Sequence, residues 1–188
     1  MTKQYCFFFD PTRCVNCRSC ELACQASHSL PPNLRPRRML DIWRGTFPNT
    51  RRRFLSLSCL HCLEPACVEA CPAEAVTKRE EDGIVVVNRQ KCVGCGLCLK
   101  ACPYDVPQFD HEGIMYKCDF CVENGTEPAC VRHCPTEALL YGTWDRMKEL
   151  EKRGRAHGLT GDTRPCLWMS EVEPMLEQGS GRQSQDLR

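Results

Sequence analysis

The apolar positions of this chain fall in short runs, and these runs predict a set of short strands. The apolar side chains of residues 4–10 indicate one short buried strand near the start. Residues 75–78 and 83–88 predict two strands joined by a charged turn. Residues 104–109 and 113–117 predict a second pair of the same kind. The pattern therefore favours a small protein in which short strands alternate with other elements.

Two segments have the apolar period of a helix. The first begins near Arg18 and continues toward His28, because no proline interrupts it. The second begins at Trp144 and ends before Gly154, and the Thr143 hydroxyl can cap its first turn. Three apolar residues of this second helix fall on one face, which predicts packing over the body of the protein: Trp144, Met147 and Leu150.

The polar stretches predict irregular structure. Residues 29–53 are rich in proline and arginine, and we expect an inserted, loop-like stretch. This insert is either a solvated basic loop or a docking surface for an acidic patch of a partner. Beyond Gly158 the chain is polar and irregular, and residues 178–188 predict a flexible tail that orders only against a partner.

No apolar run reaches the length of about 18 residues that a membrane-spanning helix needs. The short apolar run after Met1 is also too short for the core of a signal peptide. The sequence therefore predicts neither a direct membrane span nor an export signal of its own.

Cysteine dominates the chemistry of the chain, with 18 among 188 residues. Sixteen of these cysteines form an internal repeat of four groups. The groups are Cys14, Cys17, Cys20 and Cys24; Cys59, Cys62, Cys67 and Cys71; Cys92, Cys95, Cys98 and Cys102; and Cys118, Cys121, Cys130 and Cys134.

The third group has the most informative spacing. It reads C-x2-C-x2-C-x3-C-P and ends at Pro103, as in bacterial ferredoxins that hold 4Fe–4S clusters. Gly94 and Gly96 allow the backbone to approach a cluster closely. Together with the second group and the predicted strand pair between them, it indicates one intact two-cluster ferredoxin module. Four groups of this type predict four 4Fe–4S clusters.

Other uses of so many thiols are less favoured. Zinc sites made only of cysteine usually present two separated Cys-x-x-Cys pairs rather than three close thiols and a distant fourth. A disulfide framework is typical of secreted chains, for which no signal is seen. No cysteine stands apart with a base that would make it a catalytic nucleophile.

The formal charge of +1 does not indicate nucleic-acid binding. This value counts the cysteines as neutral, whereas cluster ligands are thiolates. Sixteen thiolates outweigh the positive charge of four oxidised cluster cores, so the basic side chains can partly offset buried cluster charge.

Several residues next to the groups have plain interpretations. Cys6 is expected to be a small buried side chain of the first strand, and Cys166 a free thiol of the tail. His61 and His133 adjoin the groups, and could either donate to cluster sulfurs or serve ordinary packing.

Five segments carry a family resemblance: 4–10, 14–24, 57–67, 78–80 and 101–104. With the order of the groups, they make the span from Tyr5 to Gly154 resemble the four-cluster electron-transfer subunit of the DMSO reductase family of molybdoenzymes. The resemblance implies an α+β fold of two ferredoxin-like lobes related by pseudo-twofold symmetry, with small strands and short helices around four clusters.

The resemblance also implies a nested set of cluster ligands. The first and fourth groups would share one lobe, and the second and third groups the other. The implied sets are Cys14, Cys17, Cys20 with Cys134; Cys118, Cys121, Cys130 with Cys24; Cys59, Cys62, Cys67 with Cys102; and Cys92, Cys95, Cys98 with Cys71.

The same resemblance divides the chain into four segments. Residues 1–55 would form the first half of the outer ferredoxin lobe with the basic insert, and residues 56–110 the inner lobe. Residues 111–143 would complete the outer lobe, and residues 144–188 would form a C-terminal helix and an extended tail.

The implied function is electron transfer without catalysis on this chain. The clusters would connect a membrane anchor subunit that exchanges electrons with quinone to a molybdopterin-containing catalytic subunit of an anaerobic respiratory complex. The chain would be peripheral, attached to the membrane through its partner, and either cytoplasmic or exported with a signal-bearing catalytic subunit. The alternatives are a formate dehydrogenase or hydrogenase subunit, and a soluble polyferredoxin that carries electrons freely.

Overall fold

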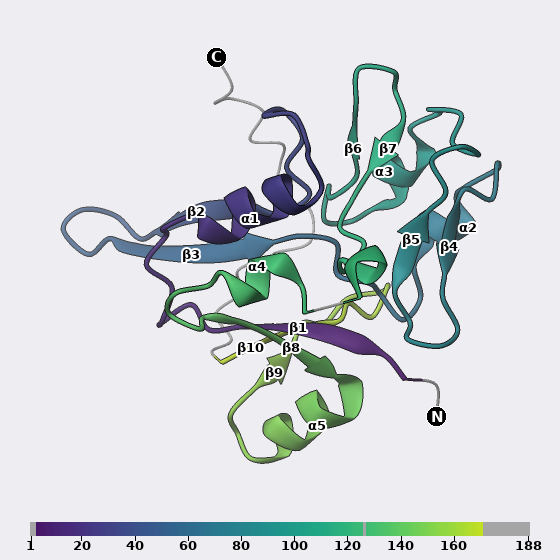
Figure 1. Cartoon of the computed structure of the whole chain (residues 1–188). Helices are drawn as coiled ribbons and strands as arrows, with labels where there is room; N and C mark the ends of the chain where they lie inside the picture. Colours follow the sequence, from purple (N-terminus) through teal and green to yellow (C-terminus); the bar gives the residue numbers. More distant parts are fainter. Residues whose placement is uncertain (1–2, 126, 171–188) are drawn as a thin grey trace.

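The computed structural model describes residues 3–125 and 127–170 and is built around one small mixed sheet (Figure 1). The strand predicted near the start is confirmed as β1, which lies inside this sheet between β8 and β10. It runs antiparallel to β8 and parallel to β10, with Phe7 opposite both Tyr141 and Leu167. The sheet order is β8-β1-β10-β9, with β1 at Tyr5–Phe9, β8 at Leu139–Thr143, β9 at His157–Gly158 and β10 at Leu167–Met169.

Three two-stranded hairpins accompany the sheet. The two predicted strand pairs are confirmed, although each strand is shorter than its predicted range. They are β4 (Val76–Lys78) with β5 (Val85–Val87), and β6 (Gln108–Phe109) with β7 (Met115–Tyr116). The third hairpin joins β2 (Arg38–Arg44) to β3 (Arg51–Leu57).

The helices are short, and most contain cysteines of the four groups. They are α1 (Ser19–Ser27), α2 (Ala66–Glu69), α3 (Leu97–Ala101), the 3₁₀ turn η1 (Val122–Asn124), α4 (Ala129–Arg132) and α5 (Trp144–Lys152). Helix α1 packs against α4, and α2 packs against α3. The fold is thus a small mixed α/β arrangement of short elements, as expected of 4Fe–4S ferredoxin-like proteins. No helix among the described residues has the length and apolar character needed to cross a bilayer.

The prediction of a loop over residues 29–53 is wrong, because β2 and part of β3 lie within it. The base of this hairpin is anchored in the core by Leu55 and Leu57, which are buried. Its far end projects from the body of the protein, as the long β2–β3 ribbon in Figure 1 shows. The cross-strand neighbours Trp43 and Arg52 support the exposed part, since the Arg52 guanidinium lies 5.1 Å from the Trp43 ring and donates to Asp41 at 2.8 Å.

The predicted C-terminal helix is confirmed as α5. The Thr143 hydroxyl accepts a hydrogen bond from the Arg146 backbone N at 3.4 Å, as a helix cap does. Met147 is buried against the sheet, and Trp144 packs edge-on against Trp168 at 5.4 Å between ring centroids. The apolar face of α5 therefore covers one side of the sheet, as its spacing predicted.

The prediction of irregular structure beyond Gly158 is confirmed for residues 159–166 and wrong for β10. All three residues of β10 are buried, because this strand pairs with β1 through the middle of the sheet. Cys166 directly precedes β10 and has only 1% of its surface exposed, so it is not a tail thiol. The predicted flexible tail at residues 178–188 lies outside the described residues.

Candidate functional site: four gatherings of thiols

In the first and third groups, the first two cysteines lie on a loop that reverses the chain through left-handed backbone conformations. In the third group Gly94 and Gly96 have φ values of 70° and 72°. In the first group Asn16 and Arg18 occupy the equivalent places with φ values of 55° and 60°. The two loops thus share one backbone course, although only the third uses glycine. In both, the third thiol then lies on the helix that follows, which is α1 or α3.

Gly94 is required for a second reason. A Cβ atom at this position would lie 2.7 Å from the backbone oxygen of Gly113, well inside van der Waals contact. A Cβ atom at Gly96 would meet nothing within 4 Å. Gly94 is therefore needed both for its conformation and for its packing against Gly113, whereas Gly96 is needed for its conformation. The close approach of both glycines to a cluster stays a prediction.

The structure brings thiols of the first and fourth groups together, because α1 packs against α4. Burial raises the pKa of Cys14, and the sulfurs of Cys20, Cys134 and Cys17 raise it further. A second gathering surrounds Cys24, whose pKa is raised to about 12, first by burial and then by Cys130 and Cys121. Cys118 belongs to this second gathering, since Cys24 and Cys130 are the nearby thiols that raise its pKa.

Thiols of the second and third groups meet in the same way where α2 packs against α3. The pKa values of Cys62 and Cys67 are both raised to about 12, chiefly by burial. For both thiols, Cys59 and Cys102 are among the neighbours that raise the pKa further. These four sulfurs form the third gathering.

The fourth gathering lines a pocket. Cys71 from the second group faces the three closely spaced thiols of the third group across this pocket. Its walls are otherwise apolar: the lining residues are Cys71, Cys92, Cys95 and Cys98, with Ala73, Ala75, Val76, Val93, Gly96, Phe109 and Met115. A pocket with sulfur donors and no other side-chain ligand suits a soft metal centre held by thiolates.

The four gatherings fit iron–sulfur clusters in their donor chemistry. All 18 cysteines are free thiols, so the disulfide alternative finds no support. Burial raises the pKa of four of these thiols, so they keep their protons near neutral pH, and binding of a metal would displace those protons: Cys24, Cys62, Cys67 and Cys118. Sulfur ligands in apolar surroundings also exclude water from the bound centre.

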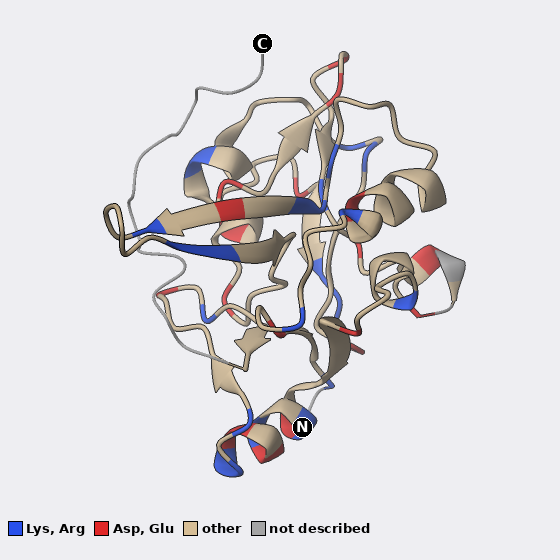
Figure 2. Ribbon diagram, turned by 90° about the vertical axis from the view of Figure 1, so that its left-hand side faces the viewer, with Lys and Arg blue, Asp and Glu red and all other residues tan. Residues whose placement is uncertain are grey.

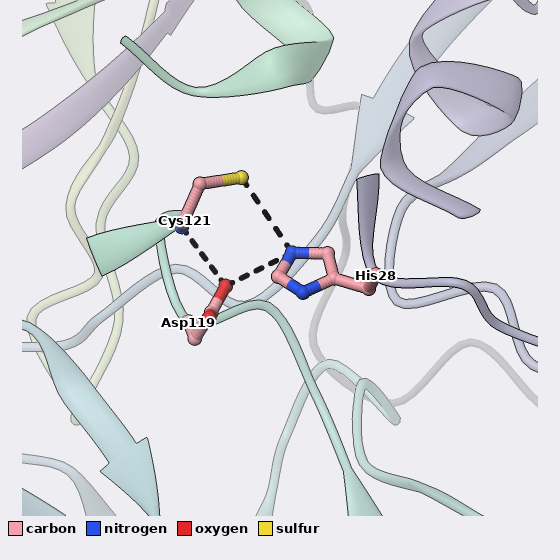
Figure 3. Close-up of side chains that lie close together, drawn as sticks. All are labelled: His28, Asp119 and Cys121. Carbon is pink, nitrogen blue, oxygen red and sulfur yellow. Dashed lines mark hydrogen bonds and ion pairs between the residues drawn. The ribbon is translucent and has the colours of Figure 1, made fainter. Parts of the chain in front are cut away.

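Sequence reasoning missed a contact next to the fourth group. His28, at the end of α1, directs its Nε2 atom at both Asp119 and Cys121 (Figure 3). Nε2 lies 3.3 Å from the Asp119 carboxylate and 3.6 Å from the Cys121 sulfur, and the Asp119 carboxylate also accepts from the Cys121 backbone N at 2.9 Å. The hydrogen bonds to Asp119 and then to Cys121 raise the pKa of His28 to about 10. No sequence spacing announces this contact, because 93 residues separate His28 from Cys121.

The two histidines singled out from the sequence use their Nδ1 atoms for contacts with the backbone, and the Nε2 atom of His61 has no hydrogen-bond partner among the described residues. Donation from these histidines to cluster sulfurs stays a prediction. His61 is buried, and its Nδ1 atom accepts a hydrogen bond from the Val85 backbone N at 3.0 Å. Burial lowers the pKa of His61 well below its usual value, so the ring is neutral. The Nδ1 atom of His133 lies 2.9 Å from the backbone oxygen of Ala129. Cys6 is buried in β1 as predicted and packs in one apolar cluster with Cys166.

Comparison with known families defines the class of this site. The family model described as a 4Fe–4S dicluster domain matches residues 50–144, and a model described as a 4Fe–4S binding domain matches residues 11–27. The two matches together span all four cysteine groups. The chain is therefore a 4Fe–4S ferredoxin-type protein.

Similar proteins narrow this class further. The B subunit of anaerobic dimethyl sulfoxide reductase from Escherichia coli K12 is 42% identical over 161 residues, which cover 79% of this chain and 78% of the relative. The thiosulfate reductase electron transfer subunit of Salmonella typhi is 36% identical over 153 residues, covering 77% and 79%. A formate dehydrogenase iron-sulfur subunit of Wolinella succinogenes is 34% identical over 165 residues, covering 74% and 81%. The chain belongs to the iron–sulfur electron-transfer subunits of the DMSO reductase family, and these are not the catalytic subunits of their complexes.

Proposed function

We propose that the chain holds four 4Fe–4S clusters and conducts electrons between a membrane anchor subunit that oxidises quinol and a molybdopterin-containing catalytic subunit. The observation that carries this proposal is the gathering of thiols from different cysteine groups at four places in the folded chain. The dimethyl sulfoxide reductase subunit at 42% identity makes a reductase of that type the favoured complex.

The proposed ligand sets follow the gatherings. Each combines three thiols of one group with the last thiol of another, as the four-cysteine sites of two-cluster ferredoxins do. The sets are Cys14, Cys17, Cys20 and Cys134; Cys24, Cys118, Cys121 and Cys130; Cys59, Cys62, Cys67 and Cys102; and Cys71, Cys92, Cys95 and Cys98.

The nested sets give two ferredoxin-like lobes related by a pseudo-twofold axis. The packing of α1 on α4 supports an outer lobe, and the packing of α2 on α3 supports an inner lobe. Residues 1–55 and 111–143 form the outer lobe and residues 56–110 the inner lobe. The segment 144–188 contributes more than a tail, because α5 covers the sheet and β10 is one of its strands.

When bound, each cluster supplies a one-electron carrier that changes little in shape. The protein binds the clusters, spaces them and keeps water from most of their sulfurs. Two thiols differ from the rest, because Cys17 and Cys95 are exposed. Each follows an exposed valine by two positions, Val15 with 62% and Val93 with 69% of the surface exposed. These two apolar, sulfur-bearing patches are the places where electrons enter and leave.

The far end of the β2–β3 hairpin is the proposed contact with an acidic partner surface. Phe47 at its tip is 91% exposed and Trp43 is 61% exposed. Arginine side chains accompany them along β3, seen as the blue stretch of the projecting ribbon in Figure 2. Exposed aromatic and arginine side chains are the composition of interface anchors, so this hairpin carries the docking function considered for residues 29–53.

Purification of the tagged chain from native membranes tests the proposal. We expect a large molybdenum-containing subunit and a membrane subunit to be recovered with it. The peripheral location follows from the same association, on whichever side of the membrane the complex lies. Recovery of the chain alone, still loaded with iron, would instead favour a freely diffusing polyferredoxin. Recovery with a formate-oxidising subunit would favour the formate dehydrogenase alternative, which the Wolinella relative represents.

A further inference from the structure

Arg37 carries a positive charge into the interior of the protein. It directly precedes β2, and only 1% of its surface is exposed. Its Nη1 atom donates to the backbone oxygen of Ser56 at 3.3 Å and to the Ser56 hydroxyl at 3.0 Å. Its Nε and Nη2 atoms have no hydrogen-bond partner among the described residues. Burial of a charge without a counterion is unfavourable, so a negative group near Arg37 is needed to balance it.

The surroundings of the guanidinium are an aromatic ring and sulfur atoms. Its Cζ atom lies 4.3 Å from the centroid of the Phe7 ring. Burial is the largest influence on the pKa of Arg37 and lowers it. The next largest influences are four thiols, which raise this pKa, and none of them is a carboxylate. These thiols are Cys130, Cys118, Cys20 and Cys24. In return, the guanidinium opposes the effect of burial by lowering the pKa of each of the four.

The one carboxylate that is buried among the described residues is engaged by other groups. Glu21 is buried, but its carboxylate accepts from the Met39 backbone N and forms ion pairs with Arg18 at 3.7 Å and Arg35 at 4.0 Å. The negative charge that balances Arg37 must therefore come from the neighbouring cysteine sulfurs. Neutral thiols cannot supply it, whereas cluster-bound thiolates can.

Ser56 holds the guanidinium in this place. Its hydroxyl accepts from Arg37 and also lies 3.5 Å from the Cys20 sulfur. The unpartnered Nε and Nη2 groups belong to the same planar fork. The three N–H donors of these two nitrogen atoms thus remain for acceptors that the described part of the chain does not provide, in a region whose other groups are sulfurs.

We propose that Arg37 is a positioning residue shared by the two clusters of the outer ferredoxin lobe, and that its charge and free N–H groups favour the reduced state of both. The inference rests on the proposed function, since it assigns Cys20 to one cluster and Cys24, Cys118 and Cys130 to the other. Each cluster gains one negative charge when it accepts one electron from the quinol side. A fixed positive charge nearby stabilises that product in a low-dielectric interior, so it raises the reduction potential.

The test compares Arg37→Gln and Arg37→Lys in the complete complex, by redox titration followed with electron paramagnetic resonance. In Arg37→Gln we expect the equilibrium constant for reduction of both outer-lobe clusters to fall at least tenfold, about 59 mV for a one-electron couple. The inner-lobe clusters should keep their potentials. Arg37→Lys keeps the charge and should recover most of the shift. Arg153→Gln removes an arginine that is paired with Glu149 on the surface of α5 and is the matched control.

A second readout covers loss of the clusters themselves. Loss of the two outer-lobe clusters from Arg37→Gln, with the inner two retained and with recovery in Arg37→Lys, would also support a role of this charge at these two clusters. Unchanged outer-lobe potentials in an iron-replete Arg37→Gln complex would overturn the inference. An equal shift in the reduction potentials of all four clusters would also overturn it. A shift of the outer-lobe potentials in Arg153→Gln would do the same. A wild-type chain without 4Fe–4S clusters would instead overturn the proposed function.

Discussion

The chain contains both proposed cluster ligands and buried structural thiols. Substitution of a cysteine by serine, which replaces one sulfur atom with oxygen, distinguishes the two kinds. Cys98 lies on α3 and faces the pocket that Cys71 completes. Cys166 is also buried and packs with Met147, Trp168 and Cys6, although it lies close enough to Cys62 to raise the pKa of that thiol. Neither burial nor a neighbouring thiol therefore identifies a proposed ligand, whereas membership of one of the four cysteine groups does.

Replacing Cys98 with serine should disrupt one cluster, change its spectrum and slow electron delivery to the catalytic subunit. A serine hydroxyl is a poor substitute for a thiolate ligand of iron. Assays of the catalytic subunit with artificial donors should remain largely intact. Cys166→Ser is the matched control and should keep its full iron content. Equal loss of both activities in Cys98→Ser would indicate general misassembly instead.

The glycines of the third group offer a comparison of the same kind. Alanine at Gly94 or Gly96 adopts a left-handed conformation that costs roughly 1–2 kcal/mol. Only at Gly94 does the added Cβ also collide with the Gly113 backbone, which adds about 1–3 kcal/mol. Gly94→Ala should thus lose iron at a lower temperature than Gly96→Ala. Indistinguishable heat stability of the two variants would contradict the close approach.

Residue contacts that span long stretches of sequence were beyond prediction. The four cysteine groups could be found because each is local, with ligands a few positions apart. Arg37 and its four sulfurs come together only through packing of β2 on α1 and of α1 on α4. The pairing of His28 with Asp119 depends in the same way on where α1 ends. Their sequence surroundings carry no period or spacing that distinguishes them from surface residues.

At the scale of elements, strands formed by self-contained hairpins were predicted best. β4 with β5 and β6 with β7 each close over a short turn, so the sequence between the partners shows the turn residues. β2 and β3 were missed because proline and arginine dominate their segment, and its apolar residues are buried only at the base. β10 was missed because its partner is β1, at the other end of the chain.

The exposed end of the β2–β3 hairpin should act as an anchor for the partner subunit. Phe47→Ser removes its most exposed aromatic side chain and should lower recovery of the large subunit roughly tenfold or more, as expected of an interface anchor. Iron content of the chain should not change, because the hairpin tip is remote from the buried base. Leu140→Ser on β8, also at an exposed apolar position, is the control. Normal recovery with Phe47→Ser would show that the complex forms through another surface.

At the scale of the whole molecule, the charge of the protein depends on its cofactors. The chain alone is nearly neutral, with a formal charge of +1. Sixteen cluster thiolates would make the loaded protein acidic, with the negative charge in the interior. Arg37 and the amines that donate to backbone oxygens near the gatherings, such as Lys78 beside Cys62 and Lys117 beside Cys118, are then the interior counterpart of that charge.

The iron and sulfide content of the anaerobically purified chain, measured together with its electron paramagnetic resonance on stepwise reduction, tests the central claim most directly. Four clusters on this chain predict about sixteen irons and an equal number of sulfides. They also predict four separate one-electron reductions with cubane spectra. Clearly fewer irons, zinc in their place, or thiols joined to one another would contradict the account.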